Sequence, residues 1–310
     1  MVTLRSKDGL SSILPSDLKD VRGHLLAKKG RVVDSKLIEE LIQKGKHQQH
    51  QHVSLSNSPV LSMIKKVTAE PIYANIFRTE STRKKILNLA KSVSIQKGLY
   101  EEILKVKRTS YYSYRHFVLI ASLAAKMSMD LSHYGYYFDP KKAFILSLTH
   151  DIGKARVPTY ILNKKTPLTS NEYRILHTHP YYSLLLLSYY LGHKSGEAIE
   201  VAFGHHERID GSGYPRGVKT MPHYTRLVTI IDIFDALVAI RPYRKRQFTV
   251  RGALDILIHD MHAGKLPDLP VRLIVSYYRT KKEDIRHMLL SERSRDPLPT
   301  GNCYGKIAKK

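Results

Sequence analysis

Histidines and aspartates at spaced positions in the middle of this 310-residue sequence are the side chains best suited to chemistry. Imidazole and carboxylate ligands together suit iron, manganese or zinc, whereas magnesium and calcium prefer oxygen ligands alone. Any one of these residues alone is more often structural or exposed, so the prediction rests on the whole set. The set is too large for one ion and fits two ions that share a carboxylate. The candidate ligands are His116, His150, Asp151, His179, His205, His206 and Asp232.

The stretch His205–Pro215, HHERIDGSGYP, predicts a tight loop that begins at two of these histidines. Gly211 and Gly213 allow positive φ or a close approach of backbones, and Pro215 stiffens the exit of the turn. The loop is therefore expected to lie close to whatever His205 and His206 bind.

Helices must position these ligands, because apolar residues recur at helical spacing through most of the sequence after about residue 72. A helical bundle can direct side chains from several helices at one site in its core. Thr169 followed by Glu172 predicts a capping box at the start of one helix. No alternation of strand and helix patterns is seen, which argues against a Rossmann or barrel enzyme. Helices are predicted at residues 141–150, 169–177, 180–191, 196–205, 226–239, 249–261 and 281–290.

Residues 13–55 predict a small separate unit in which short strands and turns precede one helix capped near Asp34. The tract KHQQHQHVSLSNSP follows. It is interpreted as a polar linker rather than a metal site, although it contains His47, His50 and His52.

The net charge is +24, from 51 lysines and arginines against 27 acidic residues. Such a balance attracts polyanions, which include nucleic acids, nucleotides and anionic membrane surfaces. The basic residues are scattered along the sequence, as is typical of a solvated surface. Nucleic-acid binding is therefore not expected on this ground alone.

The sequence predicts a soluble protein of the cytoplasm. Its single cysteine, Cys303, excludes an internal disulfide and suits a reducing compartment. The N-terminus lacks the pattern of a secretion signal, and no apolar run is long and uncharged enough to predict a membrane span.

Three motifs resemble the signatures of the HD-GYP family. They are HDIGKARVPTYILNK at residues 150–164, HHERIDGSGYP at 205–215 and TRLVTIIDIFDALVAIRPYR at 225–244. The resemblance covers most of residues 95–260. It implies a bacterial phosphodiesterase that hydrolyses cyclic di-GMP on an all-helical HD-type scaffold with two or three metal ions.

The resemblance also implies a fold and a division into domains. The expected fold is mainly α, an HD-type helical bundle preceded by a small α+β N-terminal domain. A regulatory or structural unit is expected at residues 1–72, a helical linker at 73–98, the HD-GYP phosphodiesterase at 99–295 and a basic tail at 296–310. Signalling protein partners and a homodimer are compatible with this organisation.

By the same resemblance, the ligands divide between two ions that are bridged by one aspartate. One ion would be held by His116, His150, Asp151 and Asp232. The second ion would be held by His179, His205, His206 and the bridging Asp151. Asp235, three residues after Asp232, would face roughly the same way and is interpreted as a structural hydrogen-bonding residue.

The resemblance assigns catalytic roles to Asp151 and Lys154. Two ions would lower the pKa of a water between them from near 16 towards about 7, and the hydroxide would attack phosphorus in line. Both ions and the Lys154 ammonium would offset the charge that grows on the phosphoryl oxygens. The substrate-binding residues would be Lys154, Gly213, Tyr214, Pro215, Arg241 and Arg244.

Two positions depart from the family pattern. In three-metal members a glutamate stands one helical turn before the upstream histidine, where this sequence has Tyr112. Because tyrosine substitutes poorly for a bridging carboxylate, two ions are expected, iron or manganese, with zinc as the alternative. In the family a two-metal site is associated with stopping at linear pGpG, and a third metal with continuing to GMP. Ser183 stands where relatives have glycine, and no chemical consequence is expected from it.

Two alternatives stand beside hydrolysis of cyclic di-GMP. One is a receptor that binds a cyclic dinucleotide without turnover, against which the complete ligand set argues. The other is a phosphodiesterase that acts on a different cyclic dinucleotide.

Overall fold

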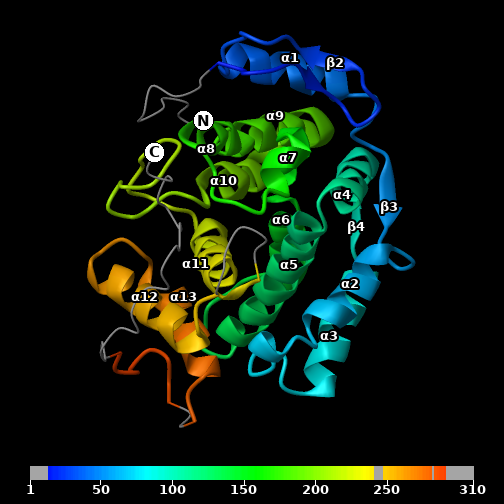
Figure 1. Cartoon of the computed structure of the whole chain (residues 1–310). Coiled ribbons are helices and arrows are strands. Elements are labelled where there is room, and N and C mark those ends of the chain that lie inside the picture. Colours follow the sequence, from blue (N-terminus) through cyan, green and yellow to red (C-terminus); the bar gives the residue numbers. More distant parts are fainter. Residues whose placement is uncertain (1–12, 241–246, 281–282, 291–310) are drawn as a thin grey trace.

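The computed structural model describes residues 13–240, 247–280 and 283–290 (Figure 1). This part of the chain is built mainly from helices, with four short strands in its N-terminal third, so the prediction of a mainly helical fold is confirmed. Arg241, Arg244, Cys303 and the predicted tail at 296–310 lie outside the described residues.

Short strands, α-helices and 3-10 helices make up the described chain. The strands are β1 (Leu18–Lys19), β2 (Leu25–Ala27), β3 (His52–Ser54) and β4 (Ser94–Gln96). The α-helices are α1 (Ser35–Gly45), α2 (Pro59–Val67), α3 (Glu80–Lys91), α4 (Lys97–Thr109), α5 (Tyr111–Ser132), α6 (Pro140–Thr149), α7 (Thr159–Leu162), α8 (Ser170–Leu176), α9 (His179–Leu191), α10 (Gly196–Gly204), α11 (His223–Val238), α12 (Val250–His262) and α13 (Asp268–Tyr277). The 3-10 helices are η1 (Pro71–Tyr73), η2 (Ile152–Arg156) and η3 (Gly192–Ser195).

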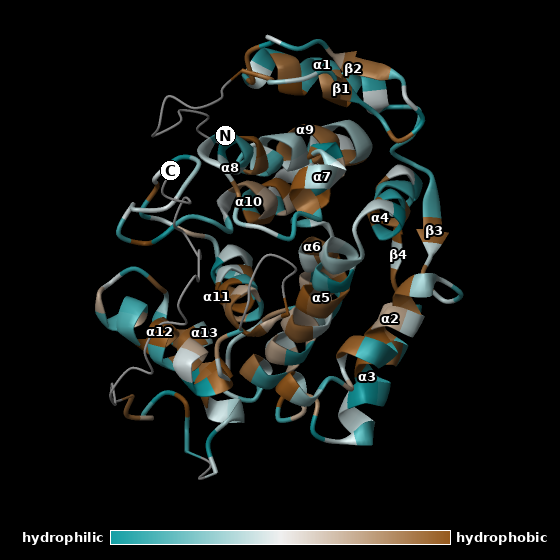
Figure 2. Cartoon of the chain, in the orientation of Figure 1, coloured by the Kyte–Doolittle hydropathy of each residue, from teal (hydrophilic) through white to brown (hydrophobic). Residues whose placement is uncertain are grey.

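Helices α5 and α9 form the centre of the bundle. Both are apolar on nearly every side, and a helix with no polar face must be buried on all sides. Helix α5 packs against α6, α11, α2 and α4, whereas α9 packs against α1, α10 and η2. Figure 2 shows the long hydrophobic stretches of α5 in the middle of the molecule. These two helices therefore set the frame in which the candidate ligands lie.

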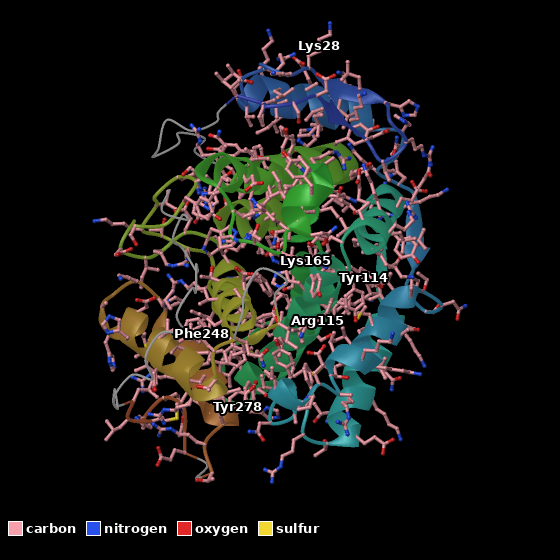
Figure 3. The ribbon with its side chains drawn as sticks, viewed as in Figure 1. Lys28, Tyr114, Arg115, Lys165, Phe248 and Tyr278 are labelled. Carbon is pink, nitrogen blue, oxygen red and sulfur yellow. The ribbon has the colours of Figure 1, made fainter. Side chains whose placement is uncertain are left out.

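The C-terminal helices cover the far end of α11. Helix α12 packs against α11 and α13, and α13 also contacts α5. The ring of Tyr278, labelled in Figure 3 at the end of α13, lies 5.8 Å from that of Phe234 on α11. Aromatic contacts of this kind fix the end of α11 that carries the last predicted ligand.

The N-terminal segment packs directly on the bundle. Strands β1 and β2 pair antiparallel, and α1 lies along α9 at the top of Figure 1. Three hydroxyl groups of α9 contact this segment: Tyr182 bonds Ser16 Oγ at 2.7 Å, Tyr189 donates to Asp20 Oδ2 at 3.5 Å, and Tyr190 accepts the backbone N–H of Val21 at 3.2 Å. The hydrophobic core of the segment is continuous with that of the bundle. The predicted domain boundaries stay predictions.

Two expectations from the sequence are wrong in detail. The tract interpreted as a polar linker contains β3, which pairs antiparallel with β4 from the predicted helical linker at 73–98. The helix expected at 281–290 is absent from its described part, residues 283–290. Ile285 and Met288 are buried at helical spacing, but Asp284 Oδ1 accepts the N–H of Arg286 at 2.9 Å and forms a turn instead.

The capping box predicted at the start of α8 is present. Thr169 Oγ1 accepts the N–H of Glu172 at 3.3 Å, and Glu172 Oε2 accepts the N–H of Thr169 at 2.7 Å. Across the described residues, no helix combines the length and the apolar character needed to cross a membrane.

Candidate metal centre

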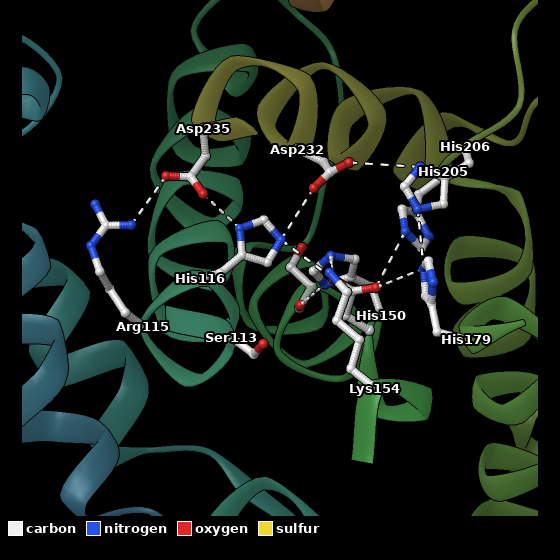
Figure 4. A network of polar contacts seen from close by, with 12 residues as sticks. Ser113, Arg115, His116, His150, Lys154, His179, His205, His206, Asp232 and Asp235 are labelled. Atoms are coloured by element: carbon white, nitrogen blue, oxygen red, sulfur yellow. Dashed lines mark hydrogen bonds and ion pairs between the residues drawn. The ribbon is translucent and has the colours of Figure 1, made fainter. Parts of the chain in front are cut away.

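The predicted ligands come from five places in the bundle. Figure 4 shows six of them, His116, His150, His179, His205, His206 and Asp232, pointing towards one another. One lies on α5, two follow the end of α6, one begins α9, two follow the end of α10, and one lies on α11. All but His206 are buried. The structure thus brings together His116, His150, Asp151, His179, His205, His206 and Asp232.

The seven side chains form two clusters, and within each cluster the potential ligand atoms lie within 4.8 Å of one another. One cluster contains Asp151, His179, His205 and His206. The other contains His116, His150 and Asp232. The sequence resemblance implies the same two histidine sets.

Asp151 lies between the clusters, with one oxygen facing each. Its Oδ1 is 3.1 Å from His179 Nε2 and 3.6 Å from His205 Nε2. Its Oδ2 is 3.3 Å from His150 Nε2 and 3.4 Å from His116 Nε2. A carboxylate placed in this way can bridge two ions.

Asp232 also faces both clusters. Its Oδ1 lies 3.1 Å from His116 Nε2, and its Oδ2 lies 3.9 Å from His206 Nδ1. Burial opposes its ionisation, but the hydrogen bond and the charge of His116 hold the pKa of Asp232 below its usual value. Asp232 is therefore available to a cation as a carboxylate.

Four of the histidines present Nε2 to the clusters because Nδ1 is held by an acceptor behind the ring. His116 Nδ1 donates to Asp235 Oδ2 at 2.6 Å, which gives Asp235 the hydrogen-bonding role predicted for it. In the other three, Nδ1 donates to the carbonyl three residues earlier, at 2.6 Å in His150, 2.7 Å in His179 and 3.1 Å in His205. Those carbonyls belong to last turns of helices, where no intrahelical partner exists. Such contacts orient metal-binding histidines.

The buried polar atoms of the site fit divalent metal ions. Among the described residues, the Nε2 atoms of His116, His150 and His205 and Asp151 Oδ1 are buried without a hydrogen bond. Buried polar atoms are nearly always bonded, so these atoms call for a further partner. Burial lowers the pKa of His116, but the surrounding Asp151, Asp232 and Asp235 raise it to about 9. The carboxylates therefore attract positive charge to this point.

Lys154 lies at the edge of the site, where its ammonium forms an ion pair with Asp151 Oδ2. Burial opposes the ionisation of Asp151, but Lys154 and the neighbouring His150 and His179 hold its pKa well below the usual range. Asp151 is thus a carboxylate with a cationic group beside it. Lys154 is a predicted catalytic residue that contacts Asp151 without belonging to either cluster.

Residues 103–265, more than half of the chain, match a family model described as HD domain. The chain belongs to the HD domain family. The HD-type fold and the family predicted from the three motifs are thereby confirmed. Membership implies dependence on divalent metal ions, in agreement with the histidine and aspartate clusters.

Curated relatives of this HD domain protein are phosphodiesterases by name. A 3'3'-cGAMP-specific phosphodiesterase of Vibrio cholerae is 33% identical over 181 residues, which cover 56% of this chain and 41% of the relative. A cyclic di-GMP phosphodiesterase of Pseudomonas aeruginosa is 33% identical over 147 residues, covering 46% and 34%. A cyclic di-GMP phosphodiesterase of Thermotoga maritima is 36% identical over 154 residues, covering 44% and 40%. The matches thus span about two fifths or less of each relative.

A solved HD-GYP-type protein of Bdellovibrio bacteriovorus aligns over 86% of this chain and 96% of its own. Its TM-score is 0.39 and its identity 15%, so the likeness is too weak to add to the family assignment.

The loop that closes the HD domain site depends on Gly213 and Glu207. A Cβ at Gly213 would lie 2.4 Å from Glu207 Cα, so only glycine fits there without movement of the backbone. The buried Glu207 carboxylate accepts the N–H groups of Arg216 at 2.8 Å and Gly217 at 2.9 Å. Gly211 has a φ of +81°, as the loop prediction allows. Glu207 has no predicted role from the sequence, although it stands within the motif.

The ring of Tyr214 connects the loop to the metal centre. It is stacked on His206 with centroids 4.7 Å apart and planes 14° apart, and Pro215 follows it through a cis peptide bond. On its other side it is stacked on His177, which none of the three motifs contains. Burial and the neighbouring His179 lower the pKa of His177 to about 4, so the ring is neutral. No sequence signal pairs residues 177 and 214, because only the fold brings them together.

A short contact joins η2 to α9 behind the ligands. The N–H of Gly153 donates to Ser183 Oγ at 2.8 Å. A Cβ at Gly153 would lie 2.0 Å from the carbonyl oxygen of His179, so the backbones of the two elements meet there. Ser183, for which the sequence predicts no chemical consequence, thus connects the elements that carry Asp151 and His179.

Tyr112 lies one turn before His116 on α5 and is 38% exposed. Its ring meets that of Tyr111 edge to face at 6.0 Å, and neither cluster includes it.

Proposed function

We propose that this chain is a phosphodiesterase that hydrolyses cyclic di-GMP to linear pGpG with the help of two divalent metal ions, iron or manganese. The observation that carries the proposal is the position of Asp151, whose two oxygens face two separate histidine clusters. The family match and the names of the curated relatives support the reaction class. The seven residues of the two clusters are the proposed ligands.

The residues of the chain prepare the reaction in three ways. Asp151 and Asp232 are held as carboxylates, and the imidazoles are fixed with Nε2 towards the clusters. Divalent ions held there supply the activation of water and part of the charge that offsets the phosphate. The Lys154 ammonium, which lies beside Asp151, would contact a phosphoryl oxygen of the substrate. The loop residues Gly213, Tyr214 and Pro215, with Arg241 and Arg244, would form the remaining contacts to substrate.

Two ions, rather than three, are proposed because of Tyr112. The described residues at the metal centre contain no further carboxylate on the turn of α5 before His116. Linear pGpG is therefore the proposed end product. We also propose that the segment before the HD domain is regulatory, that the protein acts in the cytoplasm with signalling partners, and that it can form a homodimer.

The test uses the 310-residue chain loaded with manganese or iron without oxygen, and its metal content is measured before the assay. Cyclic di-GMP and 3'3'-cGAMP are offered separately, since one matched relative is named for the latter. We expect linear pGpG from cyclic di-GMP. Faster turnover of 3'3'-cGAMP would identify that dinucleotide as the preferred substrate. Tight binding of a cyclic dinucleotide without any product would indicate a receptor.

The matched variants are Asp151→Ala and Asp255→Ala. Both remove a buried aspartate, but Asp255 lies on α12, outside both clusters, and pairs with Arg251 at 3.0 Å. Asp151→Ala should lose both the metal and the turnover because it removes the bridge, whereas Asp255→Ala should keep both. Absence of any linear product from the metal-loaded parent, with either substrate, would refute the phosphodiesterase proposal.

A further inference from the structure

A chain of polar contacts runs from the segment between α2 and α3 to the metal centre. Glu70 precedes η1, and Tyr73 is the last residue of η1. Both lie outside residues 103–265, the part of the chain that matches the HD domain family. The contacts of these two residues with α5 and α11 place groups from outside the HD domain next to one of the metal clusters.

Arg115 makes the first connection. Its Nε donates to Glu70 Oε1 at 2.8 Å and its Nη2 donates to Glu70 Oε2, so the two side chains form a two-pronged ion pair. Its Nη1 donates to Asp235 Oδ1 at 3.2 Å (Figure 4). Only 13% of the Arg115 side chain is exposed. Two-pronged pairs of this kind hold both partners in a fixed geometry.

Tyr73 makes the second connection. Its hydroxyl donates to Asp235 Oδ1 at 2.6 Å, and the residue is completely buried. Burial and the charge of Asp235 raise the pKa of Tyr73 well above its ordinary value, so the hydroxyl keeps its proton and remains a donor. Among the described residues, Asp235 Oδ1 therefore accepts hydrogen bonds from the side chains of Tyr73 and Arg115, and Tyr73 lies outside the HD domain.

Asp235 connects these contacts to the proposed metal ligand His116. While Oδ1 is held by Tyr73 and Arg115, Oδ2 accepts the Nδ1–H of His116 at 2.6 Å. The opposite atom of that ring, Nε2, faces the cluster at 3.1 Å from Asp232 Oδ1. The orientation of His116 thus depends on the position of Asp235, which in turn depends on Glu70, Tyr73 and Arg115.

We infer that Glu70, Tyr73 and Arg115 are positioning residues for the ion bound by His116, His150 and Asp232, so that the segment before the HD domain sets the affinity of one metal site and not of the other. The inference rests on the proposed metal centre but not on the identity of its substrate. The second site differs because His179 and His205 are oriented by carbonyl groups of helix ends, which need nothing from residues 70–73.

The test compares Tyr73→Phe with Tyr277→Phe, each in the 310-residue chain. Each variant removes one hydroxyl that donates to a carboxylate oxygen at 2.6 Å, but the partner of Tyr277 is Asp130, outside both clusters. Glu70→Gln, which weakens the ion pair with Arg115, is a second variant in case Tyr73→Phe folds poorly. Circular dichroism is recorded for all of them.

The measurement is the binding of Co²⁺ without substrate, followed by titration with a chelator and by the visible absorption of the bound ions. We expect Tyr73→Phe and Glu70→Gln to bind one of two ions roughly 10- to 100-fold more weakly, the range typical for loss of an orienting contact. The other ion should keep its affinity, and Tyr277→Phe should match the parent. This readout needs no hydrolysis, so a failure of the substrate proposal does not affect it.

Unchanged affinity for both ions in folded Tyr73→Phe and Glu70→Gln would overturn the inference. Equal weakening of both ions would also overturn it, since that result indicates general loosening of the fold. A parent protein that binds no Co²⁺ would overturn both this inference and the metal centre on which it rests.

Discussion

The rings of His177 and Tyr214 lie almost parallel, with their centroids 4.0 Å apart and 10° between their planes. The other face of Tyr214 is stacked on His206. Among the described residues, no carbonyl or carboxylate accepts a hydrogen bond from His206, in contrast to the four other histidines of the centre. The ring of His206 is instead oriented by this stack and by the contact of its Nε2 with His179 Nε2 at 3.0 Å.

Replacing His177 tests the importance of this stack. His177→Ala removes one ring and should weaken the ion bound by His206 a few-fold to roughly tenfold, because an aromatic pair contributes about 0.5–1.5 kcal/mol. His177→Phe keeps a ring and should keep most of the affinity. Metal titration of the folded variants distinguishes them. If the phenylalanine variant is as weak as the alanine variant, stacking is not the cause.

Gly213→Ala should disrupt the loop beside the metal centre. The new Cβ would lie 2.4 Å from both Glu207 Cα and the backbone nitrogen of Arg208, so the backbone must shift. Strain of this kind lowers the free energy of unfolding by about 1–3 kcal/mol. Turnover should also fall, because the shift of the loop displaces Tyr214. Thermal denaturation and the hydrolysis assay measure the two effects. The control is Gly196→Ala, where a Cβ meets no atom within 4 Å and both quantities should stay near the parent values.

Metal removal should destabilise the whole bundle, because the ligands come from five helices or helix ends and several of their buried atoms otherwise have no hydrogen bond. An ion present at about 100 times its dissociation constant adds about 2.7 kcal/mol to the free energy of unfolding. Manganese should therefore raise the melting temperature of chelator-treated protein by several degrees. Magnesium should raise it much less, since it disfavours imidazole ligands. Equal shifts with both metals, or no shift at all, would contradict this expectation.

Lys154→Met should separate metal binding from turnover. Lys154 pairs with Asp151 but is not among the clustered ligands, so the variant should retain its ions. Turnover should fall about 100-fold, as is typical when one group that offsets transition-state charge is removed. Metal analysis and single-turnover rates on the same sample test both parts. Loss of the ions from the variant would assign Lys154 to the support of Asp151 rather than to the phosphate.

The proposed ligands can be predicted from the sequence, but the contacts that orient them cannot. The seven clustered residues can be predicted from the set of histidines and aspartates in the helical region together with the resemblance to the HD-GYP family, because metal binding restricts residue type. The partner of His116 cannot be selected in the same way, since Asp235 is 119 positions distant and only the packing of α5 on α11 joins them. The same holds for His177 and Tyr214.

Errors in the predicted fold have a similar origin. The spacing of Ile285 and Met288 is that of a helix, yet the Asp284 side chain ties the backbone into a turn. Strand β3 is polar and only three residues long, and it is a strand because β4, from a distant part of the sequence, pairs with it. A local pattern cannot reveal a partner at that distance.

The contact between Gly153 and Ser183 has a consequence for the distance between the two proposed ions. Asp151 stands two residues before Gly153, and His179 stands four residues before Ser183, so this contact between η2 and α9 fixes the proposed bridging residue relative to a proposed ligand of the second ion. The packing of the η2 backbone on the α9 backbone would then determine the distance between the ions. A larger side chain at position 153 would act as a spacer between η2 and α9 and lengthen the distance between the ions. The reactivity of the centre would then change while every ligand stays the same.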